Sequence, residues 1–139
     1  EKNKDGKYKR KKRFGKSIGT RAPSQFLSIL ERKLGYTGGT YQEVNTRTFK
    51  ASQYDHTSDT YQRKKLSRRH NTIDGEWVQR DLYSAFLIMN SNDTLEHTDR
   101  NRCFQNYQPF KTMHDQCITE ILQSGKHIPS SFGIHRTAA

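Results

Sequence analysis

Two clusters of basic side chains are the residues of this sequence best suited to bind another molecule. The first cluster contains Lys9, Arg10, Lys11, Lys12 and Arg13, and the second contains Arg63, Lys64, Lys65, Arg68 and Arg69. Tyr54 and Tyr61 lie just before the second cluster. Cationic side chains bind phosphate backbones, and aromatic rings stack on unpaired bases. The pattern therefore predicts contact with nucleic acid, with an affinity that falls steeply as salt is added.

One carboxylate, Asp81, stands at the start of an apolar stretch. Leu82, Ala85, Phe86 and Met89 follow it at helical spacing and are expected to form one face, which Leu87 and Ile88 widen. Because this segment is apolar nearly all round, we expect a buried helix. Taken by itself, an acid in the first turn stabilises the helix dipole.

Cys103, His114 and Cys117 offer a set of possible metal ligands. His114 and Cys117 are three residues apart, a spacing that places two side chains on the same helix face. We favour the simpler interpretation, a thiol packed on an apolar stripe with His114 at the edge of that stripe.

Three helices and one strand are expected to position these groups. Pro23 suits a first helical turn and Gly35 follows the last, so a helix is predicted over about 23–34. Residues 40–46 are predicted to be a strand and residues 50–76 to be polar and irregular, with a turn at Asp74-Gly75. The other helices are expected at 79–90 and 109–123, separated by a loop. The stripe of the third helix is Phe110, Met113, Cys117, Ile118 and Ile121.

The composition limits the class of protein. The 139 residues carry a net charge of +11 and are only 30% hydrophobic, so we expect a core completed by residues outside this chain. No apolar run is long enough for a membrane span, and no signal peptide opens the chain. Two cysteines do not make a disulfide scaffold, which favours a cytoplasmic location in association with nucleic acid.

The stretch around Asp81 resembles the third conserved motif of the RuvC nuclease domain in TnpB proteins and type V CRISPR effectors. In that motif Cys-Gly is followed by Asp-Arg-Asp-x-Asn-Ala-Ala at the start of a helix. The residues that match are Gly75, Arg80, Asp81 and Ala85. Segments 14–18, 21–27 and 45–53 resemble TnpB-like proteins in the same order and spacing. The resemblance covers roughly residues 13–90.

The resemblance implies an α/β fold, the C-terminal portion of a ribonuclease H-like (RuvC) domain. It implies a basic arm over 1–22, a RuvC-like helix and strand over 23–50, and a degenerate, zinc-less ribbon insertion over 51–76. The helix of the third motif would occupy 77–90 and a C-terminal helical extension 91–139.

The activity implied is RNA-guided DNA cleavage, with guide RNA and target DNA as partners. Asp81 would be a catalytic residue and a ligand of Mg²⁺ in two-metal phosphodiester hydrolysis. By resemblance, the other carboxylates, an Asp and a Glu, lie upstream of the matched region. We therefore expect the chain to be inactive, and largely unfolded, without the remainder of the RuvC-containing protein.

The sequence departs from the family at the zinc ribbon and beside Asp81. The positions of the two cysteine pairs fall on residues 54–58 and on Asn71 and Asp74, so no zinc is expected. We interpret His56 and His70 as solvated loop residues. Gln79 replaces the first Asp of the motif, and Tyr83-Ser84 replaces Asn-Ala.

Two alternatives stay open. One is a nuclease-dead, RNA-guided DNA-binding repressor of the same lineage. The other is a small basic nucleic-acid-binding protein without enzymatic ancestry, which would fold in isolation.

Overall fold

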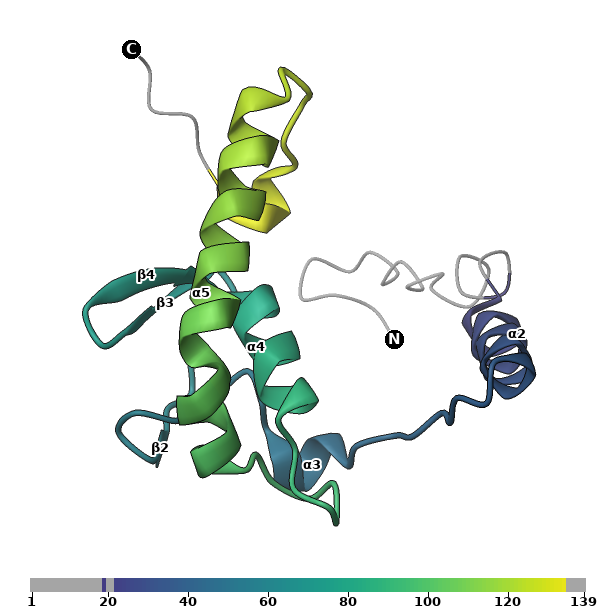
Figure 1. The fold of residues 1–139 in the computed structure, drawn as a ribbon. Coiled ribbons are helices and arrows are strands. Elements are labelled where there is room, and N and C mark those ends of the chain that lie inside the picture. Colours follow the sequence, from purple (N-terminus) through teal and green to yellow (C-terminus); the bar gives the residue numbers. More distant parts are fainter. Residues whose placement is uncertain (1–18, 20–21, 135–139) are drawn as a thin grey trace, which may run out of the picture. The chain divides into compact units, whose positions relative to one another are not determined.

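The structure, a computed structural model, describes residue 19 and residues 22–134 (Figure 1). The chain divides into two compact units between Gln42 and Glu43, and each unit is described by itself. The predicted nucleic-acid-binding residues Lys9 to Arg13 lie outside the described residues. The described part contains helices and two small antiparallel sheets, which is compatible with the expected α/β class.

The first unit contains helix α2, Pro23–Tyr36, as predicted from its sequence. Proline occupies the first turn because its missing N–H is not needed there. The chain leaves the helix through Gly38, which has a φ of +72°, and the N–H of Gly39 donates to the Leu34 carbonyl at 2.9 Å. None of the helix residues is buried.

The strand predicted over 40–46 is wrong. Residues 40–45 form no strand, and helix α3, Thr46–Phe49, begins the second unit's regular structure. The Asn45 side chain accepts a hydrogen bond from the N–H of Arg47 at 3.0 Å and so caps α3. An asparagine that bonds nearby backbone in this way favours a helix start over a sheet.

Two hairpins occupy the segment that was expected to be irregular. Strands β1, Tyr54–Asp55, and β2, Thr60–Tyr61, pair antiparallel, as do β3, His70–Ile73, and β4, Glu76–Gln79. The predicted turn at Asp74-Gly75 is confirmed. Both turn residues have positive φ, the geometry of a two-residue hairpin loop that suits the twist of paired strands.

Helix α4, Arg80–Met89, is confirmed, but the predicted buried face is wrong in part. Its buried side chains are Tyr83, Phe86 and Leu87, whereas Ala85, Ile88 and Met89 are exposed. Tyrosine takes a core position because its hydroxyl finds a hydrogen-bond partner, the side chain of His56.

Helix α5, Arg100–Gln123, begins nine residues before the predicted start, so the expected loop over 91–108 is wrong in its second half. Asp99 caps the helix by accepting a bond from the N–H of Arg102 at 3.1 Å. Pro109, predicted to open the helix, lies inside it. Its buried residues are Cys103 and His114, with Tyr107 and Phe110 half-buried between them. Met113, predicted to be in the stripe, is 62% exposed.

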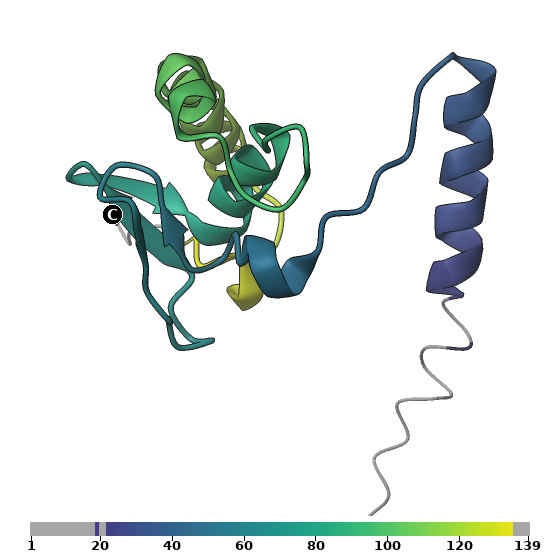
Figure 2. The same cartoon turned by 90° about the horizontal axis from the view of Figure 1, so that it is seen from below.

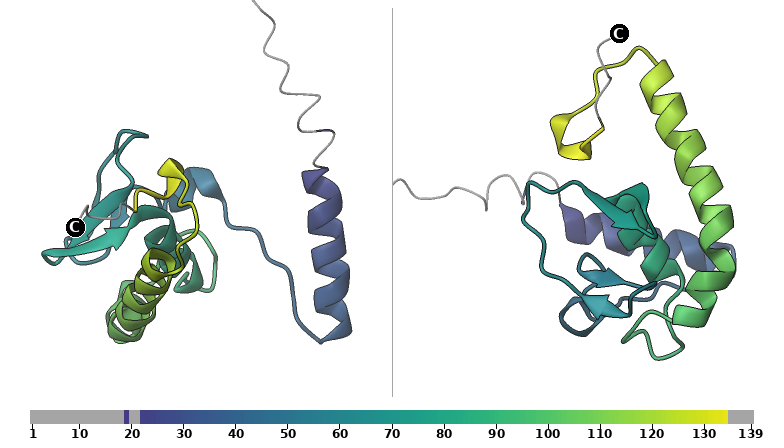
Figure 3. Two further views of the ribbon diagram at one scale, coloured as in Figure 1. Left: turned by 90° about the horizontal axis from the view of Figure 1, so that it is seen from above. Right: turned by 90° about the vertical axis from the view of Figure 1, so that its left-hand side faces the viewer.

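The core of the second unit gathers around α4, which packs against α5 and the β3–β4 hairpin (Figure 2, Figure 3). The buried cluster consists of Phe49, Tyr54, Ile73, Val78, Tyr83, Phe86, Leu87 and Cys103. After α5 the chain turns back through a 3₁₀ turn, η1, Ser130–Phe132, and ends its described part with the buried Ile134. None of the described helices is long and apolar enough to cross a membrane.

Candidate nucleic-acid interface

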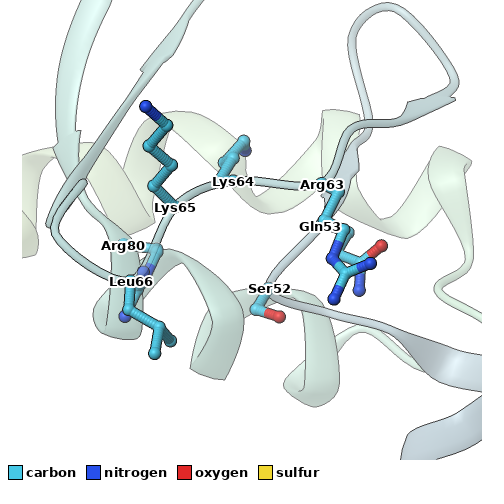
Figure 4. Close-up of a pocket in the computed structure, with 7 residues that line it drawn as sticks. All are labelled: Ser52, Gln53, Arg63, Lys64, Lys65, Leu66 and Arg80. Atoms are coloured by element: carbon cyan, nitrogen blue, oxygen red, sulfur yellow. The ribbon is translucent and has the colours of Figure 1, made fainter.

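A pocket of about 470 Å³ lies beside the start of α4 (Figure 4). Three segments line it: the turn after α3, the loop after β2 and the first residue of α4. The lining residues are Ser52, Gln53, Arg63, Lys64, Lys65, Leu66 and Arg80. A neighbouring hollow is lined by Gln62, Arg63, Lys64, Lys65, Ser67 and Arg68. We call residues 62–69 the basic loop. Among the described residues, those that line the two hollows include no acid.

Four of the five predicted basic-loop residues therefore come together, and one does not. Arg63, Lys64, Lys65 and Arg68 line the hollows. Arg69 instead packs its side chain against Gly133, where a Cβ would overlap the Cβ of Arg69. Arg69 thus contacts the returning C-terminal segment and does not line either hollow.

Arg80 joins the basic loop to α4. Its N–H donates to the Arg69 carbonyl at 3.0 Å, and its Nη1 donates to the Arg68 carbonyl at 2.9 Å. The side chain is 12% exposed. In the sequence Arg80 is only a motif match, and neither it nor Ser52, Gln53 or Leu66 is predicted to lie in a binding site. The sequence feature that could have indicated a binding role for Arg80 is its position in the motif, directly before Asp81.

The cations in this pocket are crowded. Burial lowers the pKa of the Lys64 ammonium, and the nearby Arg68 and Arg80 lower it further, against the opposing effect of Asp55. A bound anion would relieve this repulsion, since an opposite charge stabilises the protonated form of a lysine. The pocket is therefore suited to phosphate.

Asp81 is the second residue of α4, and its side chain is 65% exposed. Gln79 caps the helix: its Oε1 accepts from the N–H groups of Asp81 at 2.7 Å and Leu82 at 2.8 Å. The charged partner of Asp81 is Arg80, whose Nε lies 3.5 Å from Oδ1. The expected position at a helix start is confirmed.

Asp81 also lies at the rim of two apolar hollows. One, of about 400 Å³, is lined by Val44, Thr46, Phe49, Lys50, Ala51, Ser52, Asp81, Ser84, Ala85 and Ile88. The other, of about 180 Å³, is lined by Gln79, Asp81, Leu82, Cys117, Ile121, Phe132 and Ile134. The carboxylate thus stands between a cationic pocket and exposed apolar surface.

The residues that the structure describes do not form a magnesium site of their own. Mg²⁺ is held by carboxylate oxygens together with water or phosphate, and Asp81 is a single carboxylate already paired with an arginine. Across residue 19 and residues 22–134, no three His, Cys, Asp or Glu side chains are grouped to hold a metal ion.

The interpretation of His56 as a solvated loop residue is wrong. Its side chain is fully buried, with ring centroids of Phe104 and Tyr107 at 5.2 and 5.1 Å. Its Nδ1 lies 2.7 Å from the Tyr83 hydroxyl, and Arg100 donates to its carbonyl at 2.7 Å. His70 is exposed as expected, but it lies on β3 and stacks on Trp77.

Cys103, His114 and Cys117 do not converge. The two cysteines are separated by fourteen residues of one helix, roughly 21 Å at the usual rise. Cys117, the thiol that we expected to pack on the apolar stripe, is exposed, so that interpretation is wrong. The buried thiol is Cys103, in the part of α5 that was predicted to be a loop. His114 is not at an edge: it is 3% exposed, and its Nε2 accepts a bond from the N–H of Gln79 at 3.0 Å.

Comparisons with known proteins do not assign this chain to a family. No family model matches the chain, and no curated protein and no solved structure matches it. The resemblance to TnpB-like RuvC nucleases therefore remains a prediction, and it enters below as a proposal.

Proposed function

We propose that this chain is the nucleic-acid-binding C-terminal part of a TnpB-like, RNA-guided DNA endonuclease with a ribonuclease H-like RuvC domain. In this proposal the basic loop binds the backbone of guide RNA or target DNA. Asp81 is one ligand of Mg²⁺, and the other carboxylates come from upstream parts of the same protein. When bound, the metal activates water and stabilises the leaving oxygen.

One observation carries the proposal: the cationic pocket and the exposed carboxylate are neighbours. Arg80 lines the pocket, and Asp81, the next residue, starts α4 with its side chain in solvent. A phosphodiester strand bound in the pocket would therefore pass close to Asp81. A nuclease needs this arrangement, because the scissile phosphate must reach the metal ligands while its neighbours are held.

The exposed face of α4 supports the same proposal. Asp81, Ala85 and Ile88 are spaced along one side of the helix and line one apolar hollow. Met89, next to this face, is 67% exposed. An apolar helix face that begins at a proposed metal ligand is suited to pack against the sheet that would supply the other carboxylates.

The direct test uses the assembled protein, in which this chain is joined to the upstream RuvC part and supplied with guide RNA, target DNA and Mg²⁺. Asp81→Ala is expected to abolish cleavage and leave target binding within about twofold. The matched control is Glu96→Ala, which removes an exposed acid of a loop outside the site. Cleavage by Asp81→Ala at the control's rate would overturn the assignment.

A second function, RNA-guided binding without cleavage, is favoured by the polar contacts of Gln79 and Arg80. Gln79, where the family motif has its first Asp, caps α4 and donates to the Phe132 carbonyl at 3.2 Å, while Arg80 pairs with Asp81. If this function is right, the unaltered assembled protein binds target DNA but does not cut it with Mg²⁺ or Mn²⁺.

A third function, a small independent nucleic-acid-binding protein, is favoured by the buried cluster of the second unit. It predicts a cooperative thermal transition for the isolated chain, measured by circular dichroism. The nuclease proposal predicts a largely unfolded isolated chain. A cooperative transition is then expected only after the upstream part is added.

A further inference from the structure

Leu66 is an apolar side chain surrounded by basic residues of the pocket. It is 81% exposed, lies within the basic loop and lines the pocket together with Lys64, Lys65 and Arg80. Lys65 and Leu66 leave the loop in opposite directions (Figure 4). A purely electrostatic phosphate site has no need of an exposed leucine, whereas apolar side chains in nucleic-acid-binding proteins commonly contact bases.

The phosphate side of the pocket is set up by Arg80 and Lys64. The Nε of Arg80 is buried, and no described residue accepts a hydrogen bond from it, although Asp81 Oδ1 lies 3.5 Å away. The hydrogen bond from Nη1 to the Arg68 carbonyl holds the guanidinium against the basic loop. Lys64 is half-buried beside it and repelled by the surrounding arginines. A phosphate in the pocket would relieve the repulsion at Lys64 and would lie beside Arg80, which lines the same pocket.

We propose that this pocket holds one unpaired nucleotide of a bound strand, with its phosphate on Lys64 and Arg80 and its base against Leu66. This rests on the proposed function and specifies the kind of strand that the basic loop binds. A volume of about 470 Å³ lies within the usual range of small-molecule pockets. A base inside a duplex is stacked on both faces, so an unpaired base can pack its face against Leu66 without the cost of unstacking that a duplex must pay.

The test compares a single-stranded 12-mer, as DNA and as RNA, with a duplex of the same sequence. A 2-aminopurine at the central position reports on base contact. Affinities of the protein that joins this chain to its upstream RuvC part are measured without guide RNA over a range of salt concentrations. The variants are Leu66→Ser, Lys64→Gln and Lys126→Gln, the last a control that removes one positive charge outside the pocket.

Leu66→Ser is expected to weaken single-strand binding about fivefold, the effect of losing one or two buried methylene-sized contacts. It should change the 2-aminopurine signal, leave duplex affinity unchanged and keep the slope of log K against log salt. Lys64→Gln should reduce that slope by about 0.7 on the single strand, and Lys126→Gln should not. Comparison of the DNA and RNA arms shows which strand is preferred.

The nucleotide proposal is overturned if Leu66→Ser weakens single strand and duplex equally, or weakens neither. It is also overturned if inorganic phosphate at equal concentration displaces the 12-mer, because the site would then recognise phosphate alone. If the unaltered protein with its upstream part binds no oligonucleotide at all, it is the proposed function that fails.

Discussion

His56 and Tyr83, twenty-seven residues apart in the sequence, are bonded twice. The Tyr83 hydroxyl lies 2.7 Å from His56 Nδ1 and accepts from the His56 N–H at 3.2 Å. Because its oxygen accepts the backbone N–H, the hydroxyl hydrogen is free to donate to Nδ1, which requires a neutral imidazole. Arg100 donates to the carbonyls of His56 and Thr57, both at 2.7 Å. These bonds fasten the first hairpin to α4 and α5 in the part of the chain where the resembled family has a zinc site.

Tyr83→Phe should lower the free energy of unfolding by about 1–3 kcal/mol, because it leaves two buried His56 nitrogens without their partner. Urea unfolding of the chain joined to its upstream part, followed by circular dichroism, measures the change, and the same protein is used for the other stability measurements. Tyr61→Phe, at a ring that is 47% exposed and tilted against the Tyr54 ring with 4.9 Å between centroids, is the control and should change stability by less than about 0.5 kcal/mol. Equal effects of the two changes would contradict this account.

Stability should fall as the pH is lowered from about 7.5 to 5. Burial lowers the pKa of His56 below its ordinary value of 6.5; nearby Arg100 also lowers it, and Asp55 opposes both. Below that ordinary value the unfolded chain takes up a proton that the folded chain does not, so acid favours unfolding. The pKa values of Asp55 and Asp115 are also lowered, but from an ordinary value of 3.8. Protonation of these two carboxylates therefore affects stability only at lower pH.

Unfolding curves at half-unit pH intervals check this prediction. His56→Phe keeps an aromatic ring in the cage and should flatten the pH dependence between 5 and 7, whatever its effect on stability. His97→Gln, at an exposed histidine, should leave the dependence unchanged. If stability still depends on pH between 5 and 7 in His56→Phe, the pH dependence arises from other groups.

Gly133→Ala should destabilise the second unit more than Gly125→Ala. Both glycines have positive φ, +66° and +69°, so alanine costs about 1–2 kcal/mol of backbone strain at either position. Only at Gly133 would the new methyl overlap Arg69; Gly125 has open space around it. The excess, about 1–3 kcal/mol in urea unfolding, measures how well the returning segment packs. No excess would mean that the segment is not docked on Arg69 in solution.

Pro109→Ala should raise the free energy of unfolding by about 1–3 kcal/mol. Proline inside α5 has no N–H for the carbonyl four residues earlier, and alanine supplies one with the best helix propensity. Thermal unfolding followed at 222 nm measures the gain. Gln108→Ala, an exposed neighbour in the same helix, should change stability by less than about 0.5 kcal/mol. A destabilised Pro109→Ala would show that the proline sets a bend required by the core.

The periodicity of apolar residues predicts where helices lie better than it predicts which helix face is buried. The spacing of apolar residues predicts α4 within one residue of its bounds, yet Ala85 and Met89 are exposed while Tyr83 is buried. Hydropathy ranks tyrosine below methionine, but a buried tyrosine is stable once its hydroxyl is bonded. At α5 the capping residue Asp99 marks the true start of the helix, whereas Pro109 suggests a later start because proline is common in a first turn.

Features that depend only on neighbouring residues can be predicted from this sequence. These features are the helix at Pro23–Tyr36, the Asp74-Gly75 turn, the acid in the first turn of α4 and the density of positive charge between Arg63 and Arg69. Propensity, capping and charge act over a few residues, so they can be read directly from the chain.

The way in which distant segments combine depends on the tertiary fold. It buries His56 against Tyr83, brings the Phe132 carbonyl to Gln79 across fifty-three residues, and places Arg80 beside Leu66 in one pocket. Such contacts depend on which polar groups find partners when the core closes. Local pattern does not contain that information, because a buried polar group is stable only where a partner from elsewhere in the chain meets it.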